Sequence, residues 1–136
     1  MDYMSPEDYL DYISGSPLER KVAEKLREHG LPEFKPQMKV IPGRKFAYDF
    51  GWEAPESSPY SGVLLEVQGG IWGKKRKSAH STGTGITRDQ EKVAEAQLHG
   101  WIVLQCSEKN IEDGMFLDWV ERALERAGIP VSNNHG

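Results

Sequence analysis

The stretch Gly62-Val-Leu-Leu-Glu-Val-Gln-Gly-Gly-Ile-Trp72 decides the predicted fold, because it places one carboxylate, Glu66, in an otherwise apolar run that is typical of a strand. Upstream, Phe46-Ala-Tyr-Asp-Phe50 gives Asp49 a similar apolar and aromatic setting. Ionised carboxylates avoid such surroundings unless they are paired or bind a metal ion. Two of them in consecutive predicted strands therefore indicate a metal site.

The residues around these segments predict a three-stranded antiparallel meander. Its strands cover Gln37–Ile41, Lys45–Trp52 and Ser61–Gln68. Pro42-Gly43 forms the tight turn between the first two strands, and Glu53–Tyr60, rich in proline and serine, forms the loop before the third. The short connections favour antiparallel pairing of neighbouring strands.

A helix is predicted before the meander. Ser16, Pro17 and Glu19 match a capping box that opens a helix extending to about His29. A shorter, peripheral helix is predicted over Pro6–Ile13.

After the meander, the pattern alternates between helix and strand. A second capping box opens a helix over Thr87–His99, and Trp101–Cys106 reads as a short buried strand. Because a helix connects this strand to the Glu66 strand, we expect the two to pair in parallel through a right-handed crossover. Met115–Ala127 is an amphipathic helix, and Ile129–Gly136 is predicted to be a frayed tail. The expected apolar face of the middle helix consists of Val93, Ala94, Ala96, Gln97 and Leu98.

Length and composition favour one soluble domain covering residues 1–136. The chain has 38% hydrophobic and 28% charged residues, and no apolar run reaches the ~20 residues of a membrane helix. A cytoplasmic location is expected, without a membrane partner. The single cysteine, Cys106, excludes an internal disulfide and is expected to be a buried strand thiol.

The predicted order of elements and the residues Asp49, Glu66 and Gln68 resemble the PD-(D/E)XK nuclease superfamily, in which an Asp and a Glu-x-Lys on consecutive strands bind a divalent metal. The chain also resembles small phage-type nucleases of this superfamily, of the VRR-NUC and Holliday-junction-resolvase-like kind. The segments that carry this resemblance are Gly69-Gly70-Ile-Trp72, the loop with His80, Asp89-Gln-Glu-Lys92 and Leu98-His-Gly-Trp101. The resemblance implies an α/β, restriction-endonuclease-like core, α-β-β-β-α-β, over about residues 16–107. A mixed central sheet would be flanked by helices, with extra N- and C-terminal helices, the latter at about 114–127.

The spacing suits metal chemistry. Alternate residues of a strand share a face, so Glu66 and Gln68 point the same way and Asp49 on the neighbouring strand can approach them. Two carboxylates and the backbone carbonyl of Val67 form an oxygen-rich site suited to Mg²⁺ or Mn²⁺. Such an ion would activate a water for phosphodiester hydrolysis.

Gln68 departs from the motif, because an amide supplies neither a cation nor a titratable proton. Lys92 is a candidate for the missing charge, and a solvated lysine on an exposed helix face is the alternative. His80 is a second candidate, able to contact phosphate or activate water, unless it is a plain loop histidine. Glu19 resembles a first-helix glutamate that some members place near the metal, although the capping box also explains it.

A basic cluster follows the glycines. Lys74, Lys75, Arg76 and Lys77 lie in Gly73–Gly85, which is read as a mobile loop, and they would follow a DNA backbone without reading sequence, unless they are simply solvated. Arg88, expected in the first turn of its helix, opposes the helix dipole there and is assigned to phosphate. The net charge of −4 argues against coating nucleic acid by bulk charge, so binding would depend on this local patch.

These observations predict a metal-dependent DNA endonuclease acting on duplex or branched DNA, in phage or mobile-element recombination, repair or packaging. A nuclease-fold DNA-binding module without catalysis is the alternative favoured by Gln68. A structural protein, with Asp49 and Glu66 merely paired to Lys45 or Arg44, is the third. Related folds often form homodimers, and Tyr9, Tyr12 or the last helix are candidate surfaces for one.

Overall fold

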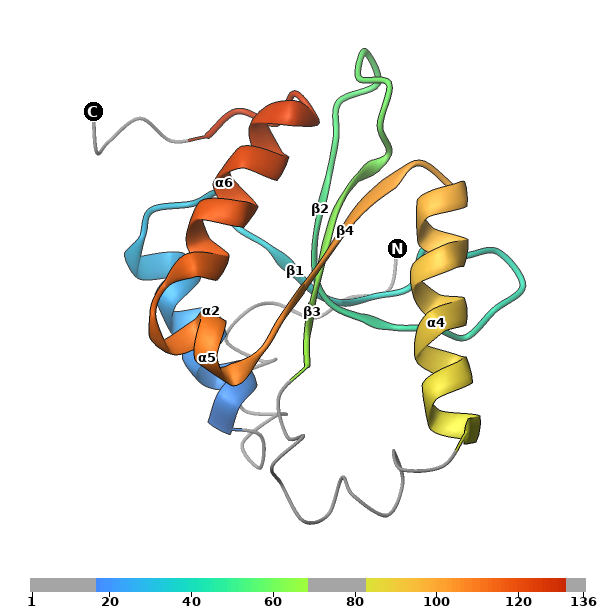
Figure 1. Cartoon of the computed structure of the whole chain (residues 1–136). Helices are drawn as coiled ribbons and strands as arrows, with labels where there is room; N and C mark the ends of the chain where they lie inside the picture. Colours follow the sequence, from blue (N-terminus) through green and yellow to red (C-terminus); the bar gives the residue numbers. More distant parts are fainter. Residues whose placement is uncertain (1–16, 69–82, 132–136) are drawn as a thin grey trace.

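A four-stranded mixed sheet forms the centre of the computed structural model, which describes residues 17–68 and 83–131 (Figure 1). The strands are β1 (Lys35–Met38), β2 (Tyr48–Glu53), β3 (Gly62–Val67) and β4 (Trp101–Cys106), and they lie in the order β1-β2-β3-β4. β1, β2 and β3 pair antiparallel, and β3 pairs in parallel with β4. The predicted meander and the predicted parallel crossover are therefore confirmed.

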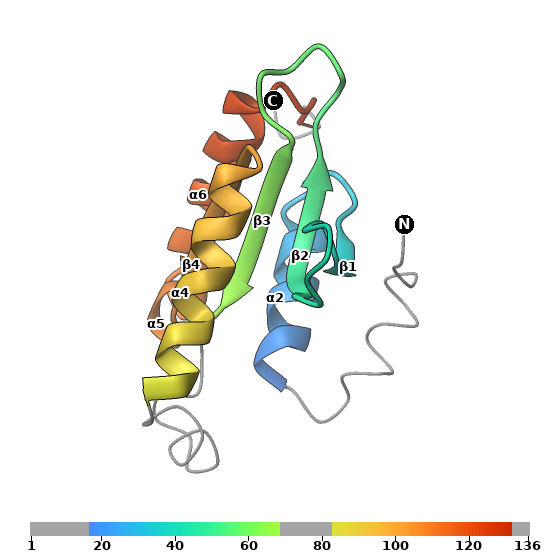
Figure 2. The same ribbon diagram turned by 90° about the vertical axis from the view of Figure 1, so that its right-hand side faces the viewer.

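Helices cover both faces of this sheet, so the fold is α/β. The helices are α2 (Pro17–Glu28), α4 (Gly83–Leu98), α5 (Glu108–Glu112) and α6 (Met115–Arg126). In Figure 1, α2, α5 and α6 lie on one side of the sheet and α4 lies alone on the other. Figure 2, turned toward α4, shows this helix running along the β3–β4 side of the sheet. None of the described helices is long and apolar enough to cross a bilayer.

Two apolar clusters hold these layers together. On α2, Val22, Ala23 and Leu26 are buried, and Leu18 packs against the same cluster. These side chains belong to the larger cluster, under α2, α5 and α6, which also takes in Phe50, Leu65, Phe116, Val120 and Leu124. The smaller cluster, on the α4 side, contains Met38, Ile41, Phe46, Tyr48, Leu64, Ala96 and Trp101.

The start of α4 was predicted wrongly. The helix begins at Gly83, inside the segment expected to be a loop, so the expected capping box at Thr87 lies within the helix. Its expected apolar face is also mostly wrong, because Ala96 is buried whereas Leu98 is 82% exposed. Small and polar residues leave α4 with only a narrow buried stripe, and through this stripe the helix packs on part of the sheet.

Three other elements differ from expectation. α5 was not predicted, although Ser107 and Asn110 form its capping box. The expected frayed tail begins with Ile129, which is buried in the larger cluster and donates its N–H to the Leu124 carbonyl at 2.9 Å. β4 is an edge strand whose middle residues are only partly buried, because the described sheet ends there. The helix predicted over Pro6–Ile13 lies outside the described residues.

Candidate functional site

The two carboxylates predicted as metal ligands meet where β2 and β3 diverge. The backbone pairing of β2 with β3 ends at Phe50 and Leu65, which are the direct sequence neighbours of Asp49 and Glu66. The Asp49 N–H donates to Glu66 Oε2 at 3.0 Å, and the Val67 N–H donates to Asp49 Oδ2 at 2.9 Å. Each carboxylate thus satisfies a backbone donor on the opposite strand. These crossed bonds fix both acids at the same end of the sheet.

Lys92 belongs to α4, which packs on one face of the sheet, and its side chain extends to this pair of carboxylates. Its Nζ donates to Glu66 Oε1 at 3.0 Å and to the Ala47 carbonyl at 2.9 Å. Its side chain is only 17% exposed, so a solvated lysine on an open helix face is the wrong description. The tertiary fold brings Lys92 to the carboxylate two residues before Gln68.

Tyr48, which the sequence did not single out as a site residue, holds the lysine in place. Its hydroxyl donates to the Lys92 carbonyl at 2.8 Å, and Lys92 Nζ lies 4.9 Å from the centre of its ring. Burial, together with the charges of Glu66 and Glu95, raises the pKa of Tyr48 to about 12, so its hydroxyl remains a donor at neutral pH. In the sequence, the indication of this role is that Tyr48 directly precedes Asp49.

Among the described residues, the site brings more acidic than basic side chains together. Burial raises the pKa of Asp49 well above its ordinary value, and the charges of Glu66 and Glu19 raise it further. Burial also raises the pKa of Glu66, although the Lys92 ammonium opposes this. Because Lys92 is the described ammonium beside both acids, a further cation would stabilise their ionised forms.

Glu19, in the first turn of α2, is close enough for its charge to affect Asp49. Helix α2 therefore places an acidic side chain near the same end of the sheet as Asp49. The capping residue proposed for it, Ser16, lies outside the described residues. Asp89 of α4 adds another charge that raises the pKa of Glu66 and was not predicted as part of the site.

The donor atoms fit a hard divalent cation bound partly through water. Asp49, Glu66 and the Val67 carbonyl offer oxygen ligands, which Mg²⁺ and Mn²⁺ prefer. Among the described residues, His, Cys, Asp and Glu side chains form no group of three or more that could hold a metal. An ion held by these three oxygen ligands would keep several waters.

Gln68 and Cys106 lie beside this pair. The Gln68 N–H donates to the Cys106 carbonyl at 2.7 Å and extends the pairing of β3 with β4. The predicted buried thiol is confirmed, since Cys106 is 1% exposed. Burial and the charges of Asp49 and Glu66 raise the pKa of this thiol to about 12, which keeps it neutral and unreactive.

The remaining predicted residues are arranged differently. Arg88 lies beyond the first turn of α4, so the helix-dipole argument for a phosphate at Arg88 is wrong; its guanidinium lies 5.6 Å from the Phe46 ring centre. Arg44 pairs with Glu91 and Glu95 instead of with Asp49 or Glu66. His80 and the basic cluster Lys74–Lys77 lie outside the described residues.

Comparison with protein-family models, with curated proteins and with solved structures gave no match. The function is therefore inferred from the geometry and chemistry of this site.

Proposed function

We propose that this protein is a Mg²⁺- or Mn²⁺-dependent endodeoxyribonuclease of the PD-(D/E)XK type. The observation that carries the proposal is the 3.0 Å contact between Lys92 Nζ and Glu66 Oε1. It supplies a cation beside the paired acids, where Gln68 replaces the lysine of the motif. The biological setting proposed is the processing of phage or mobile-element DNA.

The order of elements supports the proposal. A helix, three antiparallel strands, a helix and a parallel strand follow one another from α2 to β4. We interpret this arrangement as a restriction-endonuclease-like core. Asp49 is the second residue of β2, just before the pairing of β2 with β3 begins, and Glu66 is near the end of β3, which are the positions of the two acids in that motif.

In the proposed reaction, Asp49, Glu66 and the Val67 carbonyl would hold the divalent ion, with Glu19 near them. When bound, such an ion would supply Lewis acidity that lowers the pKa of the attacking water and offsets charge on the phosphate. Lys92 keeps Glu66 oriented through its ion pair and stabilises negative charge on the phosphate from the α4 side. Gln68 orients a water or a phosphate oxygen, while His80 and the cluster Lys74–Lys77 are assigned to the DNA backbone.

A second candidate function is a DNA-binding module that has lost catalysis. The specific observation in its favour is the same ion pair, because an ammonium already bound to Glu66 competes with a metal for that carboxylate. Under this alternative, Lys92 is a structural counter-ion, and Gln68 is a relic of the lost motif.

Cleavage assays separate the two functions. Purified protein is incubated with supercoiled plasmid, linear duplex, single-stranded and branched DNA, with Mg²⁺, Mn²⁺ or EDTA. We expect metal-dependent cleavage that Asp49→Ala abolishes and Lys92→Ala reduces by about 10²-fold or more. Lys109→Ala, which removes a lysine side chain that is 85% exposed on α5, is the matched control.

Circular dichroism of each variant shows whether a loss of cleavage reflects unfolding. If wild type and a folded Asp49→Ala variant both leave every substrate intact while binding DNA equally, the nuclease proposal is wrong and the binding module is favoured. Cleavage that persists unchanged in a folded Lys92→Ala variant would leave the enzyme in place but remove the role given to Lys92.

A further inference from the structure

The loop between β1 and β2, residues 39–47, is basic in a chain that is acidic overall. The net charge is −4, yet no Asp or Glu lies between Glu33 and Asp49, whereas Lys39, Arg44 and Lys45 lie in this loop. In Figure 1 the loop projects on the same side of the sheet as α4. Because β2 begins one residue before Asp49, the loop adjoins the acidic site.

The loop is held in one shape by its buried anchors and its turn. Ile41 and Phe46 are buried in the smaller cluster, on the α4 side of the sheet. Between them, the Arg44 N–H donates to the Ile41 carbonyl at 3.1 Å, and Gly43 has a φ of 78°. Pro42 followed by a glycine with positive φ matches a type II turn. A loop fixed in this way loses little conformational freedom when it binds a partner.

Arg44 fastens the loop to α4. Its guanidinium pairs with Glu91 at 3.0 Å and with Glu95 at 3.8 Å, and it lies 4.3 Å from the centre of the Phe46 ring. The charge of Arg44 is therefore offset within the protein. The same contacts occupy the two α4 carboxylates that face the loop.

Three other cations surround this junction. Lys39 lies where the loop leaves β1, and Lys45 lies where it returns toward β2. Arg88 of α4 stands beside the loop, since its guanidinium is 5.6 Å from the centre of the Phe46 ring. It precedes Lys92, the lysine of the acidic site, by one helical turn. All three are exposed, and none pairs with a carboxylate in the part of the chain that the structure describes. Lys39, Lys45 and Arg88 form the basic ledge.

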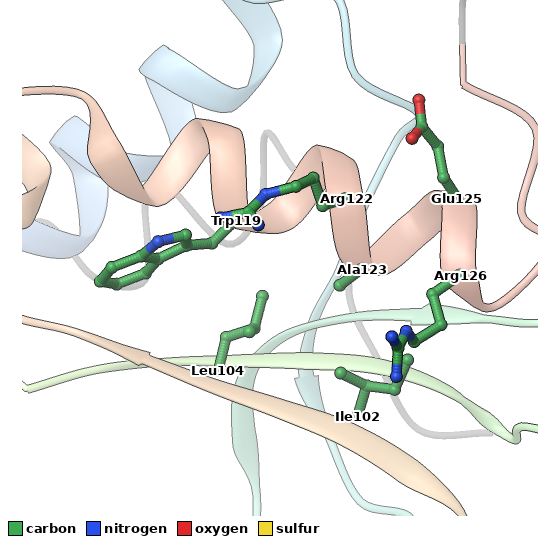
Figure 3. Close-up of a pocket in the computed structure, with 7 residues that line it drawn as sticks. All are labelled: Ile102, Leu104, Trp119, Arg122, Ala123, Glu125 and Arg126. Atoms are coloured by element: carbon green, nitrogen blue, oxygen red, sulfur yellow. The ribbon is translucent and has the colours of Figure 1, made fainter.

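The groove between α6 and β4 is a different kind of surface. Its volume is about 680 Å³, and Figure 3 shows Arg122, Glu125 and Arg126 of α6 above Leu104 of β4. Arg122 is already paired with Asp118 at 3.0 Å, and Glu125 is next to Arg126 in the helix. Charges of both signs make this groove a poor site for a polyanion, so the basic ledge is the better one.

On the basis of the DNA substrate proposed above, we propose that the basic ledge binds the phosphate backbone of duplex DNA next to the acidic site. Exposed lysine and arginine side chains suit phosphate oxygens, and such contacts carry no information about base sequence. The rings at the ledge, Phe46 and Tyr48, are only 4% and 0% exposed, so they are not available to stack on unpaired bases. The ledge therefore favours duplex over single-stranded DNA, because a duplex has the higher charge density.

Fluorescence anisotropy with short labelled duplexes in EDTA measures binding without cleavage. Lys39→Gln, Lys45→Gln and Arg88→Gln should each weaken binding about eightfold near 0.1 M salt, because each removes one phosphate contact. Each should also reduce the slope of log K against log salt by about 0.9, whatever the base sequence. Lys109→Gln, on α5, and Arg126→Gln, on α6, remove the same charges elsewhere and should keep the affinity of the wild type. Circular dichroism shows that each variant is folded.

Cleavage with Mg²⁺ or Mn²⁺ separates the ledge from the proposed nuclease function. If the wild type cleaves duplex DNA while all three ledge variants keep its affinity and salt slope, the ledge proposal is wrong and the nuclease stands. If the ledge variants lose affinity as expected but no metal supports cleavage, the nuclease proposal is wrong and the ledge stands. A wild type that binds single strands as tightly as duplexes, or polyglutamate as tightly as DNA, also overturns the ledge proposal.

Discussion

Asp49 and Glu66 lock β2 to β3 beyond the point where their backbone ladder ends. The Asp49 N–H donates to Glu66 Oε2 at 3.0 Å, while Asp49 itself accepts from the Val67 N–H at 2.9 Å. The same carboxylates are enclosed, carry pKa values raised by burial, and share one nearby ammonium. They bind the strands together, yet their charge opposes folding.

Asp49→Asn should stabilise the metal-free protein by about 1 kcal/mol, the usual scale for relieving a functional site of strain. The amide oxygen can still accept from the Val67 N–H, but the enclosed charge is gone. Urea unfolding in EDTA measures the free energy of unfolding. Asp118→Asn, on an exposed carboxylate, is the control and should change it little.

The gain from Asp49→Asn should depend on pH. The folded pKa of Asp49 is raised above its ordinary value of 3.8, so the contribution of this carboxyl to stability is complete below that pH and is lost as pH rises through the folded pKa. The advantage of the variant should therefore be absent below about pH 4, grow as pH rises and then level off. A gain that is the same at every pH would contradict a charge effect.

Binding of a divalent metal should offset the loss of folding stability that results from enclosing the paired carboxylates. Mn²⁺ at about 100 times its dissociation constant should stabilise the wild type by about 2.7 kcal/mol, because binding occurs in the folded state. Thermal melts with and without Mn²⁺ measure the shift, which should vanish in Glu66→Ala. Glu112→Ala, on α5, is the control and should keep the full shift.

Tyr48→Phe should change the alkaline limb of the stability profile. Burial raises the pKa of Tyr48 to about 12 from 10.0, so its contribution to stability is complete below pH 10 and is lost as pH rises toward 12. Because the full difference of about 2.7 kcal/mol develops only above pH 12, the wild type should lose about 2 kcal/mol relative to Tyr48→Phe by about pH 11.5. Urea unfolding between pH 8 and about 11.5 follows this difference. A gap between the two proteins that does not change with pH would contradict the assignment, and Tyr60→Phe controls for loss of a tyrosine elsewhere.

Gly62→Ala should destabilise the protein by about 3 kcal/mol or more. Gly62 has a φ of 155°, and an added Cβ would collide with the Trp52 carbonyl and lie 2.6 Å from the Trp101 ring. Gly43→Ala is the matched control, since Gly43 also has a positive φ, 78°, but a Cβ there meets nothing within 4 Å. Denaturant unfolding compares the two variants, and equal losses would show that backbone conformation, not packing at Gly62, sets the cost.

Local patterns in the sequence determined the elements and their order. Alternating and continuous apolar runs located β2, β3 and β4, and the short connections between the first three strands predicted their antiparallel pairing. The same patterns singled out Asp49 and Glu66, since a carboxylate inside an apolar strand is visible without a structure. Boundaries were less accurate, as at Gly83, because glycine and threonine have weak helix propensity and packing decides where such a helix begins.

Only the tertiary structure decided which distant residues meet. The sequence left Lys92 open between a solvated lysine and a site residue, and the packing of α4 on the sheet places it against Glu66. It also predicted β4 as a buried strand, whereas the described sheet ends there and leaves an edge. Hydrophobicity along a chain reports how a segment prefers to be packed, but contacts between layers and the position of a sheet's edge depend on every element at once.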